Sequence, residues 1–228
     1  MKHQKERMIA CLCVLGFLLC GCAPIQSGRP EVLYLPEGNR WAAYEVADRD
    51  YGGRLLLLRR EALPERVAFG AEDTAYYPQS GVDAFLSTEF LDLFPDWVQA
   101  ELCDTQIEVC RKFPDNSQTE FITRKAFLLS ATEAGIEMDI VTKEGSPLSF
   151  FRDRSRHCIR DDDGAETGWW LRSTYTSDRG LAWHIQANGT LGGRTVRQPS
   201  GIRPAVCVEP EIPCEYREDL GGYGLKQP

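Results

Sequence analysis

Short runs of hydrophobic residues alternate with turn-forming residues along most of the chain. Residues 41–46 and 55–58 are two such runs, and Gly52 and Gly53 lie between them. Apolar runs of this length, bounded by turn residues, are typical of buried strands. The pattern therefore predicts a β-hairpin in this region.

Three segments predict short helices. Ser80 stands three residues before Asp83, a spacing typical of a helix N-terminus. Pro95 suits the first turn of a second helix, and Ser130 with Glu133 has the spacing of a capping box that would begin a third. The apolar residues at helical spacing are Val82, Phe85, Leu86 and Phe90 in the first helix, and Trp97, Val98 and Leu102 in the second.

The last third of the chain predicts strands, at residues 169–173, 181–185, 190–196 and 201–208. Asn188 and Gly189 separate the second from the third, and this dipeptide indicates a tight hairpin. Pro204 lies inside the fourth run, where it favours an edge strand or a bulge because proline cannot donate a backbone hydrogen bond. Residues 143–168 are polar and rich in turn formers, so we expect a long loop region there.

The N-terminus has the pattern of an export signal. Positive residues at positions 2, 5 and 7 precede an uncharged apolar run over residues 8–19. The run ends in Leu19-Cys20-Gly21-Cys22, which resembles a bacterial lipobox and implies cleavage before Cys22 and acylation of its thiol. An ordinary secretory signal cleaved nearby, or an uncleaved anchor, is the alternative. We expect a signal peptide over residues 1–21, a tether over 22–39, one domain over 40–208 and a loose tail over 209–228.

Composition and charge narrow the function classes. The chain has 228 residues and a formal net charge of −8, and the expected signal peptide is itself positive, so the remainder is more acidic. An acidic chain without a basic stripe repels phosphate backbones, so we expect no nucleic-acid partner. Neither the cysteines nor the histidines have zinc spacing, and no glycine-rich phosphate loop occurs, so we expect no metal and no cofactor.

Five cysteines follow Cys22, and an odd number cannot all pair. We expect buried free thiols, with a loop disulfide between Cys207 and Cys214 as an open alternative. The five are Cys103, Cys110, Cys158, Cys207 and Cys214.

The last third also carries an ordered set of motifs: WWLRST, then AWHIQANGTLGG, then GIRPAV. The order resembles the bacterial family of domain of unknown function 6273, and the helix at residues 82–90 and the run at 126–130 match in the same order. The resemblance covers roughly residues 40–208, and its host range favours Gram-positive anaerobes. The signature residues it implies are Trp169, Trp170, Arg172, Trp183, Arg203 and Pro204.

The same strand–hairpin–strand ending resembles C-type-lectin-like domains, a group that includes the formylglycine-generating enzymes. This resemblance implies a single α+β domain with mixed or antiparallel sheets, two to three short helices and long loops. It also implies that paired N- and C-terminal strands hold the loop region that varies with ligand.

Catalysis and calcium binding are the alternatives with the least support in the sequence. His157 and His184 lie in no catalytic motif, and the cysteines lack the context of the reactive pair in formylglycine-generating enzymes. The acidic run at residues 161–163 lacks EF-hand spacing, so a solvated loop is the simpler interpretation. We expect no enzymatic activity.

Alternation along a strand points Trp169 and Trp170 to opposite faces, so the two rings cannot both contact one ligand. We therefore expect core positions for Trp169, Trp170 and Trp183. Arg172 and Arg203 lie in apolar runs, where each guanidinium needs carboxylate or carbonyl partners, so we expect structural clamps.

These inferences predict a lipid-anchored protein of the extracytoplasmic membrane face with a non-catalytic domain that binds a glycan or a surface protein. A structural or assembly component of an envelope complex is the alternative. Because loops on a rigid scaffold carry recognition, we expect ligand contacts from Tyr175, Asp178 and Arg179 in the loop after residue 173.

Overall fold

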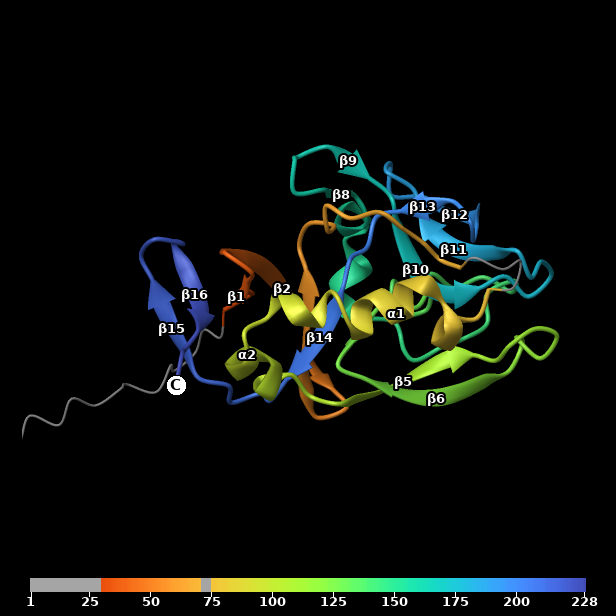
Figure 1. Ribbon diagram of the computed structural model, residues 1–228. Coiled ribbons are helices and arrows are strands. Elements are labelled where there is room, and N and C mark those ends of the chain that lie inside the picture. The colour runs from red at the N-terminus through yellow and green to blue at the C-terminus, as the bar shows by residue number, and fades with distance from the viewer. Residues whose placement is uncertain (1–29, 71–74) are drawn as a thin grey trace, which may run out of the picture.

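Short strands dominate the computed structural model, which describes residues 30–70 and 75–228 (Figure 1). Within this part, 39% of residues lie in strands and 14% in helices. The predicted α+β, C-type-lectin-like class is therefore wrong, and the fold is mostly β. One reason is local: only one helix of the described residues reaches seven residues, and the third predicted helix does not form.

A seven-stranded sheet forms the centre of the fold, in the order β15-β16-β1-β2-β3-β14-β7. All neighbours are antiparallel except β1 and β16, which are parallel. The predicted hairpin of residues 41–58 is confirmed as β2 and β3. The strands are β1 (Val32–Glu37), β2 (Arg40–Tyr51), β3 (Arg54–Arg59), β7 (Ala126–Phe127), β14 (Ala205–Val208), β15 (Cys214–Arg217) and β16 (Gly222–Leu225).

The two inner strands β3 and β14 are buried on both faces, which explains their unbroken apolar sequences. Leu55, Leu56, Leu57 and Leu58 are all buried, as is every residue of β14. The expectation that Pro204 marks an edge or a bulge is wrong. It lies one residue before β14, where no ladder hydrogen bond is lost, and its carbonyl accepts the N–H of Arg59 at 2.9 Å.

Both ends of the described chain join the sheet (Figure 1). β1 lies in the segment predicted as a tether, and β15 and β16 lie in the predicted loose tail, so neither description holds for those residues. Alternate β1 residues are buried, a period-two pattern that the flanking Pro and Gly residues concealed. The predicted signal peptide and Cys22 lie outside the described residues.

Four smaller sheets surround this centre. In Figure 1 the hairpin β5–β6 and the sheet β10-β11-β12 lie at the end of the molecule opposite β15 and β16. The Asn188-Gly189 hairpin is confirmed between β11 and β12, and Gly189 has the positive φ (80°) that such a turn requires. The strands are β4 (Val67–Ala68) with β13 (Pro199–Ser200), β5 (Thr105–Cys110) with β6 (Thr119–Arg124), β8 (Ile159–Arg160) with β9 (Glu166–Thr167), and β10 (Trp169–Thr174) with β11 (Leu181–Ile185) and β12 (Leu191–Thr195).

Two of the three predicted helices form. Ser80 caps α1 (Gly81–Ser87), because its hydroxyl accepts the N–H of Asp83 at 2.9 Å, and Pro95 immediately precedes α2 (Asp96–Glu101). Short 3-10 turns are η1 (Tyr77–Gln79), η2 (Leu91–Leu93), η3 (Ser149–Arg152) and η4 (Arg154–His157).

The third predicted helix is a single turn with intact capping contacts. Ser130 N–H donates to Glu133 at 3.0 Å, and Glu133 N–H donates to the Ser130 hydroxyl at 3.0 Å. Gly135, with a φ of 71°, ends the turn. The capping box therefore positions the Glu133 carboxylate rather than beginning a helix.

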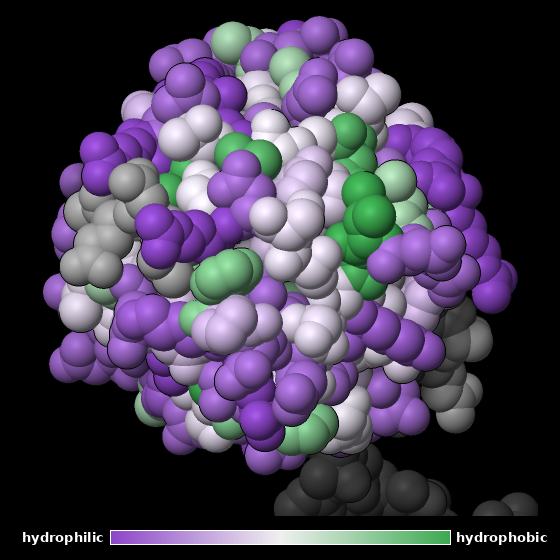
Figure 2. Space-filling view, turned by 90° about the vertical axis from the view of Figure 1, so that its right-hand side faces the viewer, coloured by the Kyte–Doolittle hydropathy of each residue, from purple (hydrophilic) through white to green (hydrophobic). Residues whose placement is uncertain are grey.

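All five described cysteines are free thiols, so the open disulfide between Cys207 and Cys214 does not form in this structure. Burial raises the pKa of the Cys207 thiol to about 12. Cys158 is exposed, against the expectation of buried thiols throughout. Large hydrophobic side chains are scattered rather than clustered on the face shown in Figure 2, which is mainly hydrophilic.

Candidate functional site

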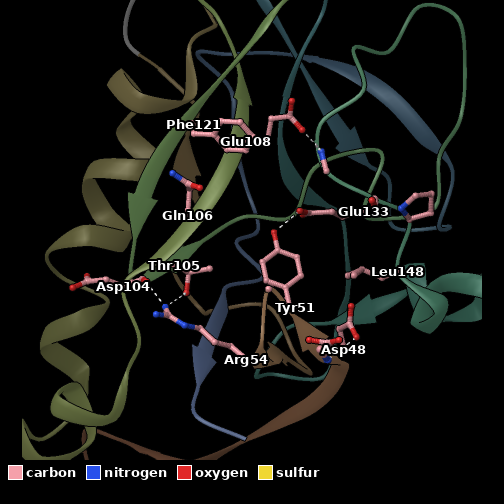
Figure 3. A pocket seen from close by; sticks show the side chains of 15 residues that line it. Asp48, Tyr51, Arg54, Asp104, Thr105, Gln106, Glu108, Phe121, Glu133 and Leu148 are labelled. Carbon is pink, nitrogen blue, oxygen red and sulfur yellow. Dashed lines mark hydrogen bonds between the residues drawn. The ribbon is translucent and has the colours of Figure 1, made fainter.

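A cleft of about 530 Å³ opens beside the hairpin β5–β6 (Figure 3). Three segments that are distant in sequence border it: the hairpin itself, the turn between β2 and β3, and residues 145–148. The volume is in the range of small-ligand sites. Its geometry follows from the hydrogen bonds that hold the three segments together.

Tyr51 and Glu133 form the floor of the cleft, and the buried Arg172 lies beneath them. The Tyr51 hydroxyl donates to Glu133 Oε1 at 2.6 Å, and Arg172 donates to both carboxylate oxygens at 2.6 and 2.7 Å. Glu133 and Arg172 are fully buried. Burial and the adjacent Glu133 raise the pKa of Tyr51 well above its ordinary value, so the phenol stays protonated and donates.

Arg172 also joins the floor to the neighbouring strands. Its Nε donates to the Glu108 carbonyl of β5, and its Nη1 donates to the carbonyl of Leu128, both at 2.8 Å. Every arm of the guanidinium therefore has a partner, which is the condition for burying it. Arg172 is a structural clamp beneath the cleft and does not line it.

One wall is the exposed face of the hairpin β5–β6. Glu108 and Phe121 are directly opposite each other in the register, so their side chains share this face with Gln106 (Figure 3). The Phe121 side chain is 64% exposed, the largest exposure of any described large hydrophobic residue. A ring left this open in a cleft wall is available for stacking.

The opposite wall carries carboxylates from the end of β2, next to the turn that leads into β3. Asp48 accepts the N–H of Asp50, and Asp50 accepts the N–H of Gly53, both at 3.1 Å. Arg54 donates to the carbonyl of Asp104 across the cleft. Five carboxylates and this single guanidinium line the cleft, so its potential is negative.

A second buried carboxylate holds the third border in place. Glu144, next to the 145–148 segment, accepts the N–H of Cys110 at 2.8 Å and the hydroxyl of Ser173. Burial raises the pKa of Glu144. The next residue, Gly145, donates its N–H to the Glu108 carboxylate at 2.8 Å, so this segment is attached to the hairpin face at two points.

The predicted ligand residues lie away from this cleft. Tyr175 stacks on Trp183 with 3.8 Å between ring centroids, and a Cβ on Gly193 would be 2.7 Å from its ring. Asp178 and Arg179 are exposed, and Asp178 accepts the N–H of Gly180 at 2.8 Å, which shapes its own turn. The structure brings these three residues into one loop, but none of them lines the cleft.

Trp169 and Trp170 are both fully buried on opposite sides of β10. The Trp169 ring lies near Phe151 and beneath the Arg203 guanidinium, and the Trp170 ring packs edge-on against Phe69. Trp183 is buried as well, with 2% of its surface exposed. These rings are core and are closed to ligands.

Arg203 is buried among carbonyl and carboxylate oxygens. It donates to the carbonyls of Arg59 and Arg156 at 2.9 and 2.8 Å, and to Glu45 at 3.0 Å. Burial lowers the pKa of Arg203 to about 10, so the side chain remains charged at neutral pH. Its role is to tie the segment before β14 to β2, β3 and η4.

A second cavity, of about 450 Å³, contains the histidine–serine pair His184 and Ser200. His184 Nε2 and Ser200 Oγ are 2.6 Å apart, and the Ser200 hydroxyl donates to the Gly168 carbonyl at 3.2 Å. Ser200 Oγ therefore lies within hydrogen-bond distance of two groups, and the donor in its contact with His184 depends on the imidazole tautomer. Burial lowers the pKa of His184 to about 4. The pair is a structural bridge.

The acidic run that raised the calcium alternative forms ion pairs with arginines. Asp162 lies 3.2 Å from Arg59, and Asp161 lies 3.5 Å from Arg66. Within residues 30–70 and 75–228, no three His, Cys, Asp or Glu side chains converge as a metal site would require.

Comparison with known proteins decides the family. Residues 52–210 match the family model described as Domain of unknown function (DUF6273), which is more than half of the chain. The chain belongs to this family. Searches of curated proteins and of solved structures gave no match.

The DUF6273 match contains most of the cleft, and it begins at Gly52 in the β2–β3 turn. The strands β1, β2, β15 and β16 lie outside it, although they form one continuous part of the central sheet. Asp48, Asp50 and Tyr51 therefore come to the cleft from outside the matched residues.

Sequence reasoning missed the residues of the cleft. Phe121 lies in a polar segment without an apolar run, and its exposure follows from the register of β5 and β6. Glu133 was recognised only as a capping residue. The available signal was Arg172 in WWLRST, because an arginine inside an apolar strand requires a carboxylate or carbonyl partner from elsewhere in the chain.

Proposed function

We propose that this chain is a lipid-anchored protein of the extracytoplasmic membrane face and that its DUF6273 domain binds a ligand, a glycan or a surface protein, in the cleft. The observation that carries the proposal is the exposed Phe121 ring in the wall of a cleft of about 530 Å³. Aromatic faces stack on sugars and anchor protein partners, and clefts between rigid elements position them.

The floor of the cleft supports binding rather than acid–base catalysis. Both oxygens of Glu133 accept hydrogen bonds from Arg172, and Tyr51 donates its proton to the same carboxylate. A general acid or base must exchange its proton with a substrate, whereas these three side chains form their hydrogen bonds with one another. The floor therefore supplies a rigid surface against which a ligand packs.

The anchor is proposed from the N-terminal sequence, where a basic segment, an apolar run and a cysteine occur in the order of a lipoprotein signal. No helix within the described residues is long and apolar enough to cross a bilayer. Mass spectrometry of the mature N-terminus is expected to show a diacylglyceryl-modified Cys22. An unmodified N-terminus further along the chain would contradict the anchor without affecting the cleft.

Binding is tested with the full chain in detergent micelles on arrays of surface glycans and peptides. We expect at least one class of array ligand to bind, and Phe121→Ala to abolish most of that signal because it removes the exposed ring. Tyr216→Ala is the matched control, since Tyr216 is 58% exposed but lies outside the cleft. Equal effects of the two substitutions, or no binding to either array, would refute the proposal.

A further inference from the structure

The charge of the cleft selects among the ligands that the proposed function allows. Asp48, Asp50, Asp104 and Glu108 line it, and only Arg54 offsets them locally. The fifth carboxylate, Glu133, is neutralised from behind by Arg172 and contributes little to this balance. A neutral ligand would desolvate the remaining carboxylates without compensation, whereas a cationic ligand compensates them.

The arrangement suits an organic cation better than a metal ion. No three carboxylate, histidine or thiol side chains converge within the described part of the chain. The Glu108 oxygens already accept hydrogen bonds from Thr119 and from the N–H of Gly145, and Arg54 donates to the Asp104 carbonyl. Carboxylates that are spread around a cleft in this way contact separate ammonium or guanidinium groups of one bound molecule, rather than a single metal ion.

The hairpin face adds an aromatic surface beside a carboxylate. Phe121 is the cross-strand neighbour of Glu108, and Figure 3 shows the two side chains together above Tyr51. A lysine or arginine side chain can lay its aliphatic stem on such a ring and place its charged head at the neighbouring carboxylate. The exposed ring and the carboxylate together therefore fit a basic side chain.

The open shape of the cleft suits a chain that passes along it. Its borders come from the hairpin face, from the turn of β2–β3 and from residues 145–148, so carboxylates lie on more than one side. An extended peptide rises about 3.3 Å per residue and points alternate side chains to one face, which presents basic groups in series. Resting on the proposed binding function, we infer that the cleft binds a basic, extended segment of a partner protein.

The test uses the full chain in micelles and a fluorescent peptide that alternates lysine and threonine. A peptide with glutamine in place of every lysine is the matched control. The lysine peptide is expected to bind about tenfold more tightly at low ionic strength, and the difference is expected to shrink in about 1 M salt, where charges are screened within about 3 Å. Equal affinity of the two peptides would overturn the inference.

Two substitutions test whether the peptide binds in the cleft. Asp104→Asn and Glu108→Gln are each expected to weaken the lysine peptide by about threefold to tenfold, because each removes one charge with little change in shape. Asp178→Asn makes the same chemical change in an exposed turn outside the cleft and is expected to leave the affinity unchanged. An equal loss in all three variants would show that only net charge matters and would overturn the inference.

The remaining outcomes separate this inference from the proposed function. Spermidine that binds as tightly as the peptide would assign the cleft to a small polyamine and overturn the protein partner. A neutral glycan whose binding is lost in Phe121→Ala would overturn the basic segment while the binding function stands. If peptides, spermidine and array ligands all fail to bind, both the inference and the proposed function fail.

Discussion

The ion pair beneath the cleft gives a prediction whose size can be worked out from the structure. Arg172→Met removes both hydrogen bonds to the buried Glu133 carboxylate and leaves that charge with only Tyr51 and the N–H of Ser130 as partners. It also removes the donors to the carbonyls of Glu108 and Leu128. Breaking one side of a buried pair costs about 3–5 kcal/mol, so we expect a loss of about 4 kcal/mol in the free energy of unfolding.

A second substitution, Glu133→Gln, tests the same ion pair, because its effect on stability is expected to have opposite signs in the natural chain and in the Arg172→Met variant. Glu133→Gln alone leaves Arg172 without its counter-charge and is expected to destabilise the protein. In the Arg172→Met background the same substitution removes an unpaired buried charge and is expected to recover about 1–2 kcal/mol. The sign change follows from the pairing of these two fully buried side chains.

Urea unfolding of the full chain measures these changes. The free energy of unfolding falls by about 2–3 kcal/mol per molar urea, so a loss of about 4 kcal/mol lowers the midpoint by about 1.3–2 M. Arg160→Met is the control, because the Arg160–Glu166 pair is largely exposed and should change stability by less than about 0.5 kcal/mol. The reasoning is refuted if Arg172→Met matches this control, or if Glu133→Gln has the same effect in both backgrounds.

Three further predictions concern the core around β10 and β11. Burial lowers the pKa of His184 from 6.5 to about 4, so between these values the unfolded state binds a proton that the folded state excludes, and stability falls with decreasing pH. From pH 7 to pH 5 the natural chain should lose about 2 kcal/mol more than His184→Gln, and parallel unfolding curves would contradict this. Gly168→Ala would place a Cβ 2.6 Å from the Ile185 carbonyl oxygen and should lower the free energy of unfolding by about 2–3 kcal/mol. In the control Gly180→Ala, the new Cβ meets only a side-chain atom at 3.4 Å, so stability should not change. Equal stabilities of the two variants in thermal or urea unfolding would be evidence against this packing. Tyr175→Ala should cost about 1–2 kcal/mol through the lost stacking on Trp183 without changing ligand affinity, and a selective loss of binding would restore the loop as the ligand site.

The sequence correctly predicted those helices and turns that are determined by interactions between residues close together in the chain. The Ser80 cap and the apolar stripe predicted α1, and Asn188-Gly189 predicted the hairpin β11–β12, because each signal acts within a few residues. The WWLRST and GIRPAV motifs identified the family, which the match over residues 52–210 confirms.

Features that depend on distant partners were not predictable in the same way. The β1 segment has a strand pattern, but its place in the sheet depends on pairing with β16, almost 200 residues later. The Ser130–Glu133 capping box was recognised from the sequence. The segment forms a turn instead of a helix, because Gly135 has a positive φ and the Glu133 carboxylate pairs with Arg172. A local propensity gives way when tertiary contacts favour another conformation.

The cleft was missed for a related reason. Its carboxylates and Phe121 come from segments that are polar and unremarkable when taken one at a time, and their convergence is a property of the fold. The tryptophans attracted attention because they are rare and large, but residues of that kind are most often core, as Trp169 and Trp170 are. The arginine of the motif was the better guide, because a buried charge requires a partner.

Hydroxyl-radical footprinting of the full chain with the lysine–threonine peptide tests most directly whether the cleft is the binding surface. Phe121 and Tyr216 are both exposed aromatic residues, and only Phe121 lines the cleft. At saturating peptide we predict that oxidation of Phe121 falls severalfold while oxidation of Tyr216 is unchanged. Unchanged oxidation of Phe121, or equal protection of Tyr216, would contradict the assignment of the cleft as the ligand site.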